Sequence, residues 1–325
     1  MEWCFGPDGD VELGIKLAAA AAPVFLAMSL FTECHRWSER AILALDEAAR
    51  SGQEEMQLQG ALGMSLSFMR GGGDTTRMAL SRSLEIAEER RDVPTQMGLL
   101  GAQSLLHLRE ADFKTALQYA KRTKALAGII EAPAVIAFAH SVLGGVLHFM
   151  GTLAGARTEI EASLHHWSRL QRHSTPQMDH PESLAVILAC TVYPEIYASL
   201  ALARTLWLQG HPAQAVERAN QVIKAAERID HPMSRVTVLP WSAWIFLCTG
   251  DFDSAERHID SGIVLAESYS LTHYATLGRG LRATLAICRG DAKAGVEILR
   301  ACLEALHSRY KLPITLLTSR SLKGS

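Results

Sequence analysis

The thirteen histidines are the residues most able to do chemistry in this 325-residue chain, because imidazole binds metals and transfers protons near neutral pH. His165 and His166 are adjacent, so on a helix they point about 100° apart and do not easily ligate one metal ion. His148 is expected one helix away and could approach His165. The sequence contains no HExxH, GxSxG, GxGxxG or EF-hand pattern. We therefore expect solvated or partly buried histidines, without a metal site, a cofactor site or a catalytic centre.

A glycine-rich stretch, GGGD at 71–74, superficially resembles a phosphate-binding loop. No lysine follows it at the spacing that such loops require. Glycine clusters between periodic segments are more typical of turns. We therefore interpret 71–74 as a turn between two helices.

Composition favours an all-α fold. Apolar residues make up 48% of the chain, mostly Ala and Leu, whereas aromatics are only 6%. Strands prefer β-branched and aromatic residues, while Ala and Leu favour closely packed helices. The net charge is −2, from 32 basic and 34 acidic residues, so the basic footprint of a nucleic-acid-binding domain is missing. We expect no direct contact with nucleic acid.

Two features indicate a cytoplasmic protein. None of the six cysteines forms a CxxC pair or a zinc pattern, which is typical of buried thiols in a reducing compartment. The uncharged segment 17–31 has 15 residues, fewer than the ~20 that a spanning helix needs. Acidic residues precede it, unlike the basic start of a signal peptide. We expect it to form a buried core helix, not a membrane span.

A repeated motif organises most of the chain. The pattern G-D/H/T-x-x-x-A occurs at 151–156, 210–215 and 250–255, with variants at 290–295 and 111–116. Three of the four intervals between motifs are 40 residues and one is 59. The leading Gly suits a left-handed turn that ends one helix, and Asp251 suits the cap of the next. Pro133 and Pro232 suit the first position of the following helix. The unit is therefore a helix-turn-helix pair.

Small residues recur at fixed places in this frame. One column holds Ser104, Gly144, Ala203, Ala243 and Ala283, and the motif itself ends on Ala or Gly. Small residues on both helices let the two backbones approach closely. We predict a single domain over 1–325, an α-solenoid of about seven antiparallel pairs. The pairs are expected near 11–50, 54–90, 93–128, 131–170, 182–229, 232–269 and 272–309.

Two segments interrupt this regularity. The polar, proline-bearing residues 171–181 account for the long interval and are predicted to form a loop insertion. Pro194 should kink or split the helix that follows the loop. At the other end, Pro313 opens an incomplete helix over 313–325 that lacks a partner helix. Because arrays need polar caps, we expect self-association through this end.

The pattern resembles the tetratricopeptide repeat, with a period of 40 instead of 34 and with most consensus aromatics missing. This variant is similar to the helical C-terminal region of large bacterial signal-transduction ATPases, including winged-helix/NTPase regulators of the MalT type. EWCF at 2–5, PDGD at 7–10 and ECHRWSERA at 33–41 resemble the junction after the NTPase module. No Walker A motif or winged helix is present, so the resemblance implies only the sensor part.

The resemblance also implies a binding surface. In tetratricopeptide arrays the first helix of each pair lines a concave groove, which places there His148, Tyr197, Arg204, Trp207 and Trp244. An arginine flanked by aromatics is a common anchor for peptide or acidic ligands. Alternatively, the tryptophans pack between helix pairs and Arg204 is solvated.

Two functions remain open on the sequence. The first is a non-catalytic sensor and protein-interaction module, orphaned from or acting with a bacterial regulator ATPase. The second is a ligand-binding array that gates a separate enzyme such as an adenylate cyclase. The expected partner in both is a protein or peptide, or a small-molecule inducer.

Overall fold

The computed structural model describes residues 1–130, 132–173, 193–229 and 231–308, and only the backbone of 171–173 and 307–308. A short 3-10 helix, Trp3–Phe5, comes first, followed within the described residues by fourteen α-helices and no strand. Their bounds are α1 Val11–Ala27, α2 Phe31–Leu43, α3 Gln53–Arg70, α4 Asp74–Glu89, α5 Val93–Arg109, α6 Phe113–Ile130, α7 Pro133–Phe149, α8 Leu153–His173, α10 Pro194–Leu208, α11 Pro212–Ile229, α12 Pro232–Thr249, α13 Phe252–Ser268, α14 Thr272–Cys288 and α15 Ala292–Ser308.

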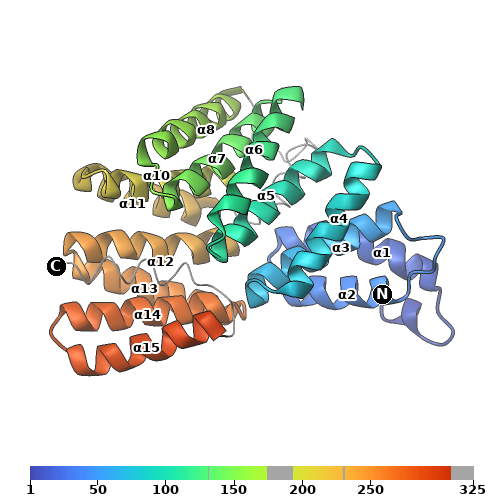
Figure 1. Ribbon diagram of the computed structural model, residues 1–325. Coiled ribbons are helices and arrows are strands. Elements are labelled where there is room, and N and C mark those ends of the chain that lie inside the picture. The colour runs from blue at the N-terminus through green and yellow to red at the C-terminus, as the bar shows by residue number, and fades with distance from the viewer. Residues whose placement is uncertain (131, 174–192, 230, 309–325) are drawn as a thin grey trace.

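Successive helices pack as antiparallel pairs, from α1 with α2 to α14 with α15, and the pairs stack into a curved array (Figure 1). The predicted all-α solenoid of tetratricopeptide type is confirmed. No described helix is both long and apolar enough to cross a membrane. The segment 17–31 contributes instead to the α1 core, where Ala18, Ala22 and Leu26 are buried.

The turns within pairs follow from glycine chemistry. Gly151, Gly210, Gly250 and Gly290 have φ angles of 78°, 81°, 80° and 101°, a region that L side chains rarely adopt. Ala111 occupies the same place after α5 with a φ of 61°. Prolines then start α7, α10 and α12, where the missing N–H has no helical partner. The Asp251 carboxylate caps α13 by accepting from the Ser254 amide at 3.1 Å.

The small-residue columns lie where paired helices touch. Ala203 on α10 and Ala215 on α11 are fully buried. A Cβ added to Gly144 would lie 2.6 Å from the Ile160 side chain, and one added to Gly295 would lie 2.8 Å from the Ala283 carbonyl oxygen. Larger side chains at these points would force the helices apart.

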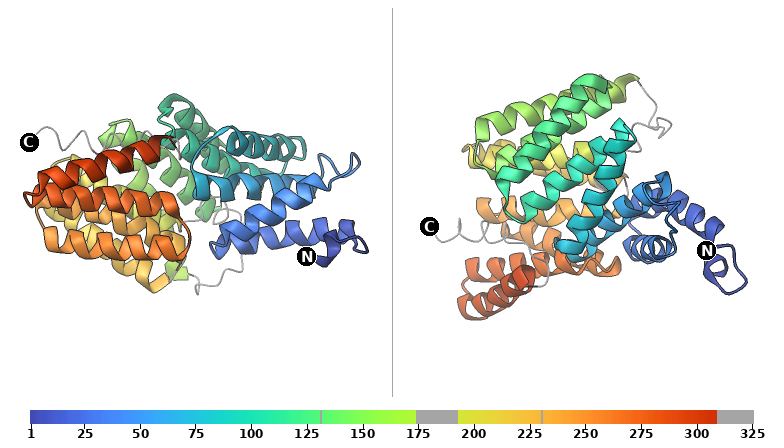
Figure 2. Two further views of the ribbon diagram at one scale, coloured as in Figure 1. Left: turned by 90° about the horizontal axis from the view of Figure 1, so that it is seen from below. Right: turned by 45° about the vertical axis from the view of Figure 1, so that its right-hand side comes forward.

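The array curls far enough for distant pairs to meet. Helix α3 contacts α14, and the His231 Nε2–H donates to the Ala27 carbonyl at 3.1 Å across 204 residues of sequence. Figure 2 shows the C-terminal pair, α14 with α15, curving back toward α3. The first helices of the pairs therefore surround an interior and the second helices form the outer surface.

Several boundaries differ from those expected. Helix α2 ends at Leu43, not near 50, because the Asp46 carboxylate accepts the Ala49 amide and stabilises a turn in place of further helix. Helix α10 begins at Pro194, so this proline starts the described helix. The predicted loop 171–181 begins too early, because α8 runs to His173, and its residues 174–181 lie outside the described residues. Residues 313–325, with their predicted self-association, lie outside the described residues.

Candidate ligand-binding site

The curled array encloses a cavity between its first helices. Its wall comes from α3, α5, α7, α10, α12 and α14, with Leu306 of α15. The cavity volume is about 140 Å³, counted as the space open to the centres of water molecules. Most lining side chains are aliphatic or aromatic, and the residues that the structure describes contribute no carboxylate, thiol or lysine to the lining. A small number of polar groups in an apolar wall is typical of a ligand pocket.

The cavity crosses the inner helices obliquely. Helices α5 and α7 line it with their C-terminal halves, over 101–109 and 141–149. Helix α12 contributes only Thr237 and Trp241, and α14 only residues 273–277 near its N-terminus. The lining therefore shifts from the C-terminal halves of α5 and α7 to the N-terminal turns of α14, as the superhelical twist of a solenoid allows.

Arg109 joins three helices at one end of the cavity. Its Nη1 donates to the Ser67 carbonyl and hydroxyl oxygens of α3, both at 3.1 Å, and its Nη2 donates to the Tyr274 hydroxyl of α14 at 3.3 Å. The guanidinium also stacks over the Phe68 ring, 5.0 Å from its centroid. These contacts hold α3, α5 and α14 together and close this end.

Arg204 is the most unusual polar residue of the wall, because it is only 8% exposed and makes none of the ion pairs among the described residues. Its guanidinium carbon lies 4.3, 4.9 and 5.7 Å from the ring centroids of Trp241, Phe149 and Trp244. Its Nε is buried without a hydrogen-bond partner. Burial lowers the pKa of Arg204 to about 10, so the side chain stays protonated at neutral pH.

His148 is a neutral neighbour of this arginine. Burial, followed by the positive charge of Arg204, holds its pKa well below 6.5. The Thr205 hydroxyl donates to the Ala201 carbonyl at 2.8 Å, so its oxygen is left to accept from His148 Nδ1 at 2.9 Å. The proton therefore sits on Nδ1, and Nε2 carries a lone pair.

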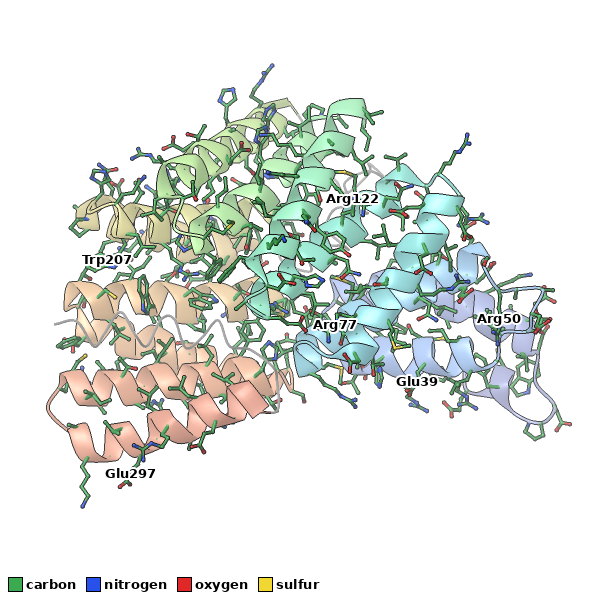
Figure 3. All side chains as sticks on the ribbon, in the orientation of Figure 1. Glu39, Arg50, Arg77, Arg122, Trp207 and Glu297 are labelled. Carbon is green, nitrogen blue, oxygen red and sulfur yellow. The ribbon has the colours of Figure 1, made fainter. Side chains whose placement is uncertain are left out.

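The structure brings together three of the five residues predicted for the groove. His148, Tyr197 and Arg204 all line the cavity. Trp207 and Trp244 do not, because each stands three residues beyond the last lining residue of its helix, Arg204 on α10 and Trp241 on α12. These tryptophans pack edge to face behind Arg204, with centroids 6.5 Å apart, and Trp207 lies by α11 and α12 in Figure 3. Direct ligand contact by either tryptophan stays a prediction.

Other cavity residues were missed, although the repeat frame contained a signal for them. Forty residues after Tyr197 and Ala201 stand Thr237 and Trp241, which line the same cavity. Forty residues after Thr237 stands Leu277, another lining residue. Extending each groove column by one period would have found them. Arg109 fits the same frame, since it stands forty residues before Phe149, but the frame does not predict its contact with α14.

The remaining histidines do not build a metal centre in the described part of the chain. His140 Nδ1 pairs with the Glu159 carboxylate at 2.6 Å, and Lys124 shares that carboxylate at 2.6 Å. His140 stacks on His166, with centroids 5.8 Å apart. No group of three or more His, Cys, Asp or Glu residues there is arranged to hold a metal ion. This cluster links α6, α7 and α8.

Comparison with known proteins places the fold. A family model described as Tetratricopeptide repeat matches residues 196–221, which span most of α10 and the start of α11. No curated protein matches the chain.

Three solved structures are similar over most of the length. A Rap protein complexed with competence and sporulation factor has 10% identity and a TM-score of 0.59, covering 95% of this chain and 93% of that one. The apo form of RapI has 12% identity and a TM-score of 0.57, covering 97% and 100%. The Rap conjugation gene regulator of plasmid pLS20, in complex with the Phr* peptide, has 12% identity and a TM-score of 0.51, covering 91% and 85%. At these identities the likeness concerns the fold.

Proposed function

We propose that this chain is a non-catalytic sensor and protein-interaction module that binds a short peptide in the cavity between its first helices. The observation that carries the proposal is that six successive first helices line one cavity. A ligand held by all of them would couple pairs from both ends of the array. A bound peptide that holds the array at one curvature would thereby change the outer surface that is offered to a protein partner.

The similar solved structures support a peptide as ligand. One Rap protein is complexed with competence and sporulation factor, and the Rap regulator of plasmid pLS20 is complexed with the Phr* peptide. The chemistry of the wall supports a binding role over a catalytic one. The Ser104 and Ser141 hydroxyls both donate to main-chain carbonyls, at 3.0 and 2.7 Å. These hydroxyls are thus already engaged with carbonyls of the helices, which favours a packing role for them.

A finer proposal concerns the cellular setting. The junction-like residues 2–10 and 33–41 support a cytoplasmic sensor derived from a winged-helix/NTPase regulator of the MalT type. In the structure Arg36 and Arg40 bind the Glu2 carboxylate at 2.6 and 2.8 Å, which fastens these two segments together. The gating of a separate cyclase is the alternative setting. A coding sequence for an NTPase or a cyclase beside this one would separate the two.

Filling the cavity should abolish binding without unfolding the protein. Ala201 lines the cavity, so we expect the Phe side chain of Ala201→Phe to occupy the space that the ligand needs. A peptide at 100 times its dissociation constant stabilises its receptor by about 2.7 kcal/mol. We expect a pool of random pentapeptides to raise the melting temperature of the wild type and not of Ala201→Phe.

The matched control is Ala213→Phe, which places the same side chain at an exposed position of α11. This variant should respond to peptides as the wild type does. Equal responses of Ala201→Phe and Ala213→Phe would show that peptides bind elsewhere.

A further inference from the structure

A buried cation without an anion is the feature of the cavity that points to a particular ligand chemistry. Arg204 is 8% exposed, and none of the ion pairs of the described residues involves it. The three aromatic faces around it attract the guanidinium, but they supply no hydrogen-bond acceptor in its plane. Its Nε–H is therefore buried without a partner. A group that loses its hydration in this way is satisfied best by a carboxylate.

A second unpartnered donor lies in the same wall. The Thr237 side chain is 7% exposed, and its hydroxyl has no hydrogen-bond partner within the described part of the chain. It stands one helical turn before Trp241, the residue closest to the Arg204 guanidinium among the rings. Buried polar groups are normally hydrogen-bonded, and Arg204 Nε and Thr237 Oγ1 are two such groups whose residues line the cavity, where a ligand can satisfy them.

The charge around Arg204 fits one negative charge. His148 is neutral, because its Nδ1–H is donated to Thr205 and its pKa lies well below 6.5. The second cation of the wall, Arg109, donates its hydrogen bonds to Ser67 and Tyr274. A doubly charged phosphate would lack a second cation beside Arg204, whereas a carboxylate is matched. The apolar lining then suits the body that carries this carboxylate.

We propose that Arg204 is the anchor for a single carboxylate of the ligand, carried on an apolar body that packs among Trp241, Phe149 and Tyr197. This inference rests on the proposed binding function and names the chemical group of the ligand that the cavity recognises. The carboxylate can belong to the C-terminus of a short peptide or to a small aromatic acid. Thr237 is the second donor in the wall.

The test compares acids with their amides. One probe is a pool of N-acetylated pentapeptides ending in Leu, Phe or Trp, prepared with a free C-terminal carboxylate and again as the C-terminal amide. The other is phenylacetate and indole-3-acetate with their amides. Binding to the full chain is measured by thermal shift and by affinity selection with mass spectrometry. We expect acids to bind the wild type at least tenfold more tightly than the matched amides.

The variants locate this preference. Arg204→Met should bind acid and amide alike, and Thr237→Val should lose several-fold in affinity for the acid only. Arg300→Met, an exposed arginine on α15 near Glu297 of the outer surface, should behave as the wild type (Figure 3). Without ligand, Arg204→Met should melt at or above the wild-type temperature, because an apolar side chain replaces an unpaired buried charge.

The outcomes separate this inference from the proposed function. Equal binding of acids and amides by the wild type would overturn the carboxylate anchor and leave peptide binding intact. Binding of the small acids through Arg204, with no response to either peptide pool, would support the anchor and overturn the peptide function. No binding of any probe would overturn both. A lower melting temperature for unliganded Arg204→Met would show that Arg204 is a structural tie of the aromatic cluster.

Discussion

Replacing Ala203 or Ala215 by Trp is expected to lower the free energy of unfolding by about 3 kcal/mol or more in each case. Both alanines are fully buried on facing sides of α10 and α11. Overpacking of a well-packed core typically costs about 1–3 kcal/mol, and an indole at a site with no free volume belongs at or above the upper end. Because α10 contacts α7, α8 and α12, and α11 contacts α12, the loss should spread from this pair to those helices.

The measurement is urea denaturation followed by far-ultraviolet circular dichroism. Ala213→Trp is the matched control, because Ala213 lies exposed on the same helix two residues before Ala215. It should unfold with the wild type. If Ala203→Trp and Ala215→Trp unfold at the same urea concentration as the wild type, these alanines do not lie at a close helix contact.

Much of the fold could be predicted, because the residues that shape it act locally. A left-handed turn at Gly250, a cap at Asp251 and a helix start at Pro232 are each decided within a few residues of sequence. The end of α2 was missed because the Asp46 side chain competes with the helix, and no repeat motif marks it. Ala111 shows that the turn frame persists even without glycine.

The candidate site could be predicted only in part, because its outline depends on the curvature of the whole array. Tyr197 and Arg204 are seven residues apart, so they share one helix face, and both line the cavity. The same reasoning failed to exclude Trp244 from the lining, because the oblique course of the cavity is a property of six helices together. The contact of Arg109 with Tyr274 joins positions 165 residues apart and leaves no local trace.

The stability of the protein is expected to fall steeply as the pH drops below about 6.5. Burial, followed by the nearby charges of Arg204 and Arg109, holds the pKa values of His148 and His273 well below the ordinary 6.5. In the folded state both imidazoles are therefore neutral, whereas in the unfolded chain they take up a proton below about 6.5. The unfolded state then binds more protons, so acid favours unfolding.

The size of this effect follows from proton linkage. Each proton taken up on unfolding contributes about 1.4 kcal/mol per pH unit, so these two histidines contribute up to about 2.7 kcal/mol per pH unit between about pH 6 and pH 5. His166, His231 and His258, whose pKa values burial also lowers, add to this slope. The lowered pKa values of Glu55 and Glu159 act in a separate window, since carboxylates begin to take up protons only nearer their ordinary value of 4.5. Above about pH 7.5 these histidines and glutamates should no longer change the free energy of unfolding with pH.

Urea denaturation at pH 7.5, 6.0 and 5.0 measures this slope in the wild type, His148→Gln and His273→Gln. Each variant should show a shallower slope than the wild type, because one of the buried imidazoles with a lowered pKa is removed. His211→Gln is the control, because that side chain is exposed in the folded protein and loses little hydration on folding. A free energy of unfolding that stays level from pH 7.5 to pH 5.0 would mean that neither imidazole is shielded from protons. A wild-type slope retained in His148→Gln and in His273→Gln would assign it to other groups.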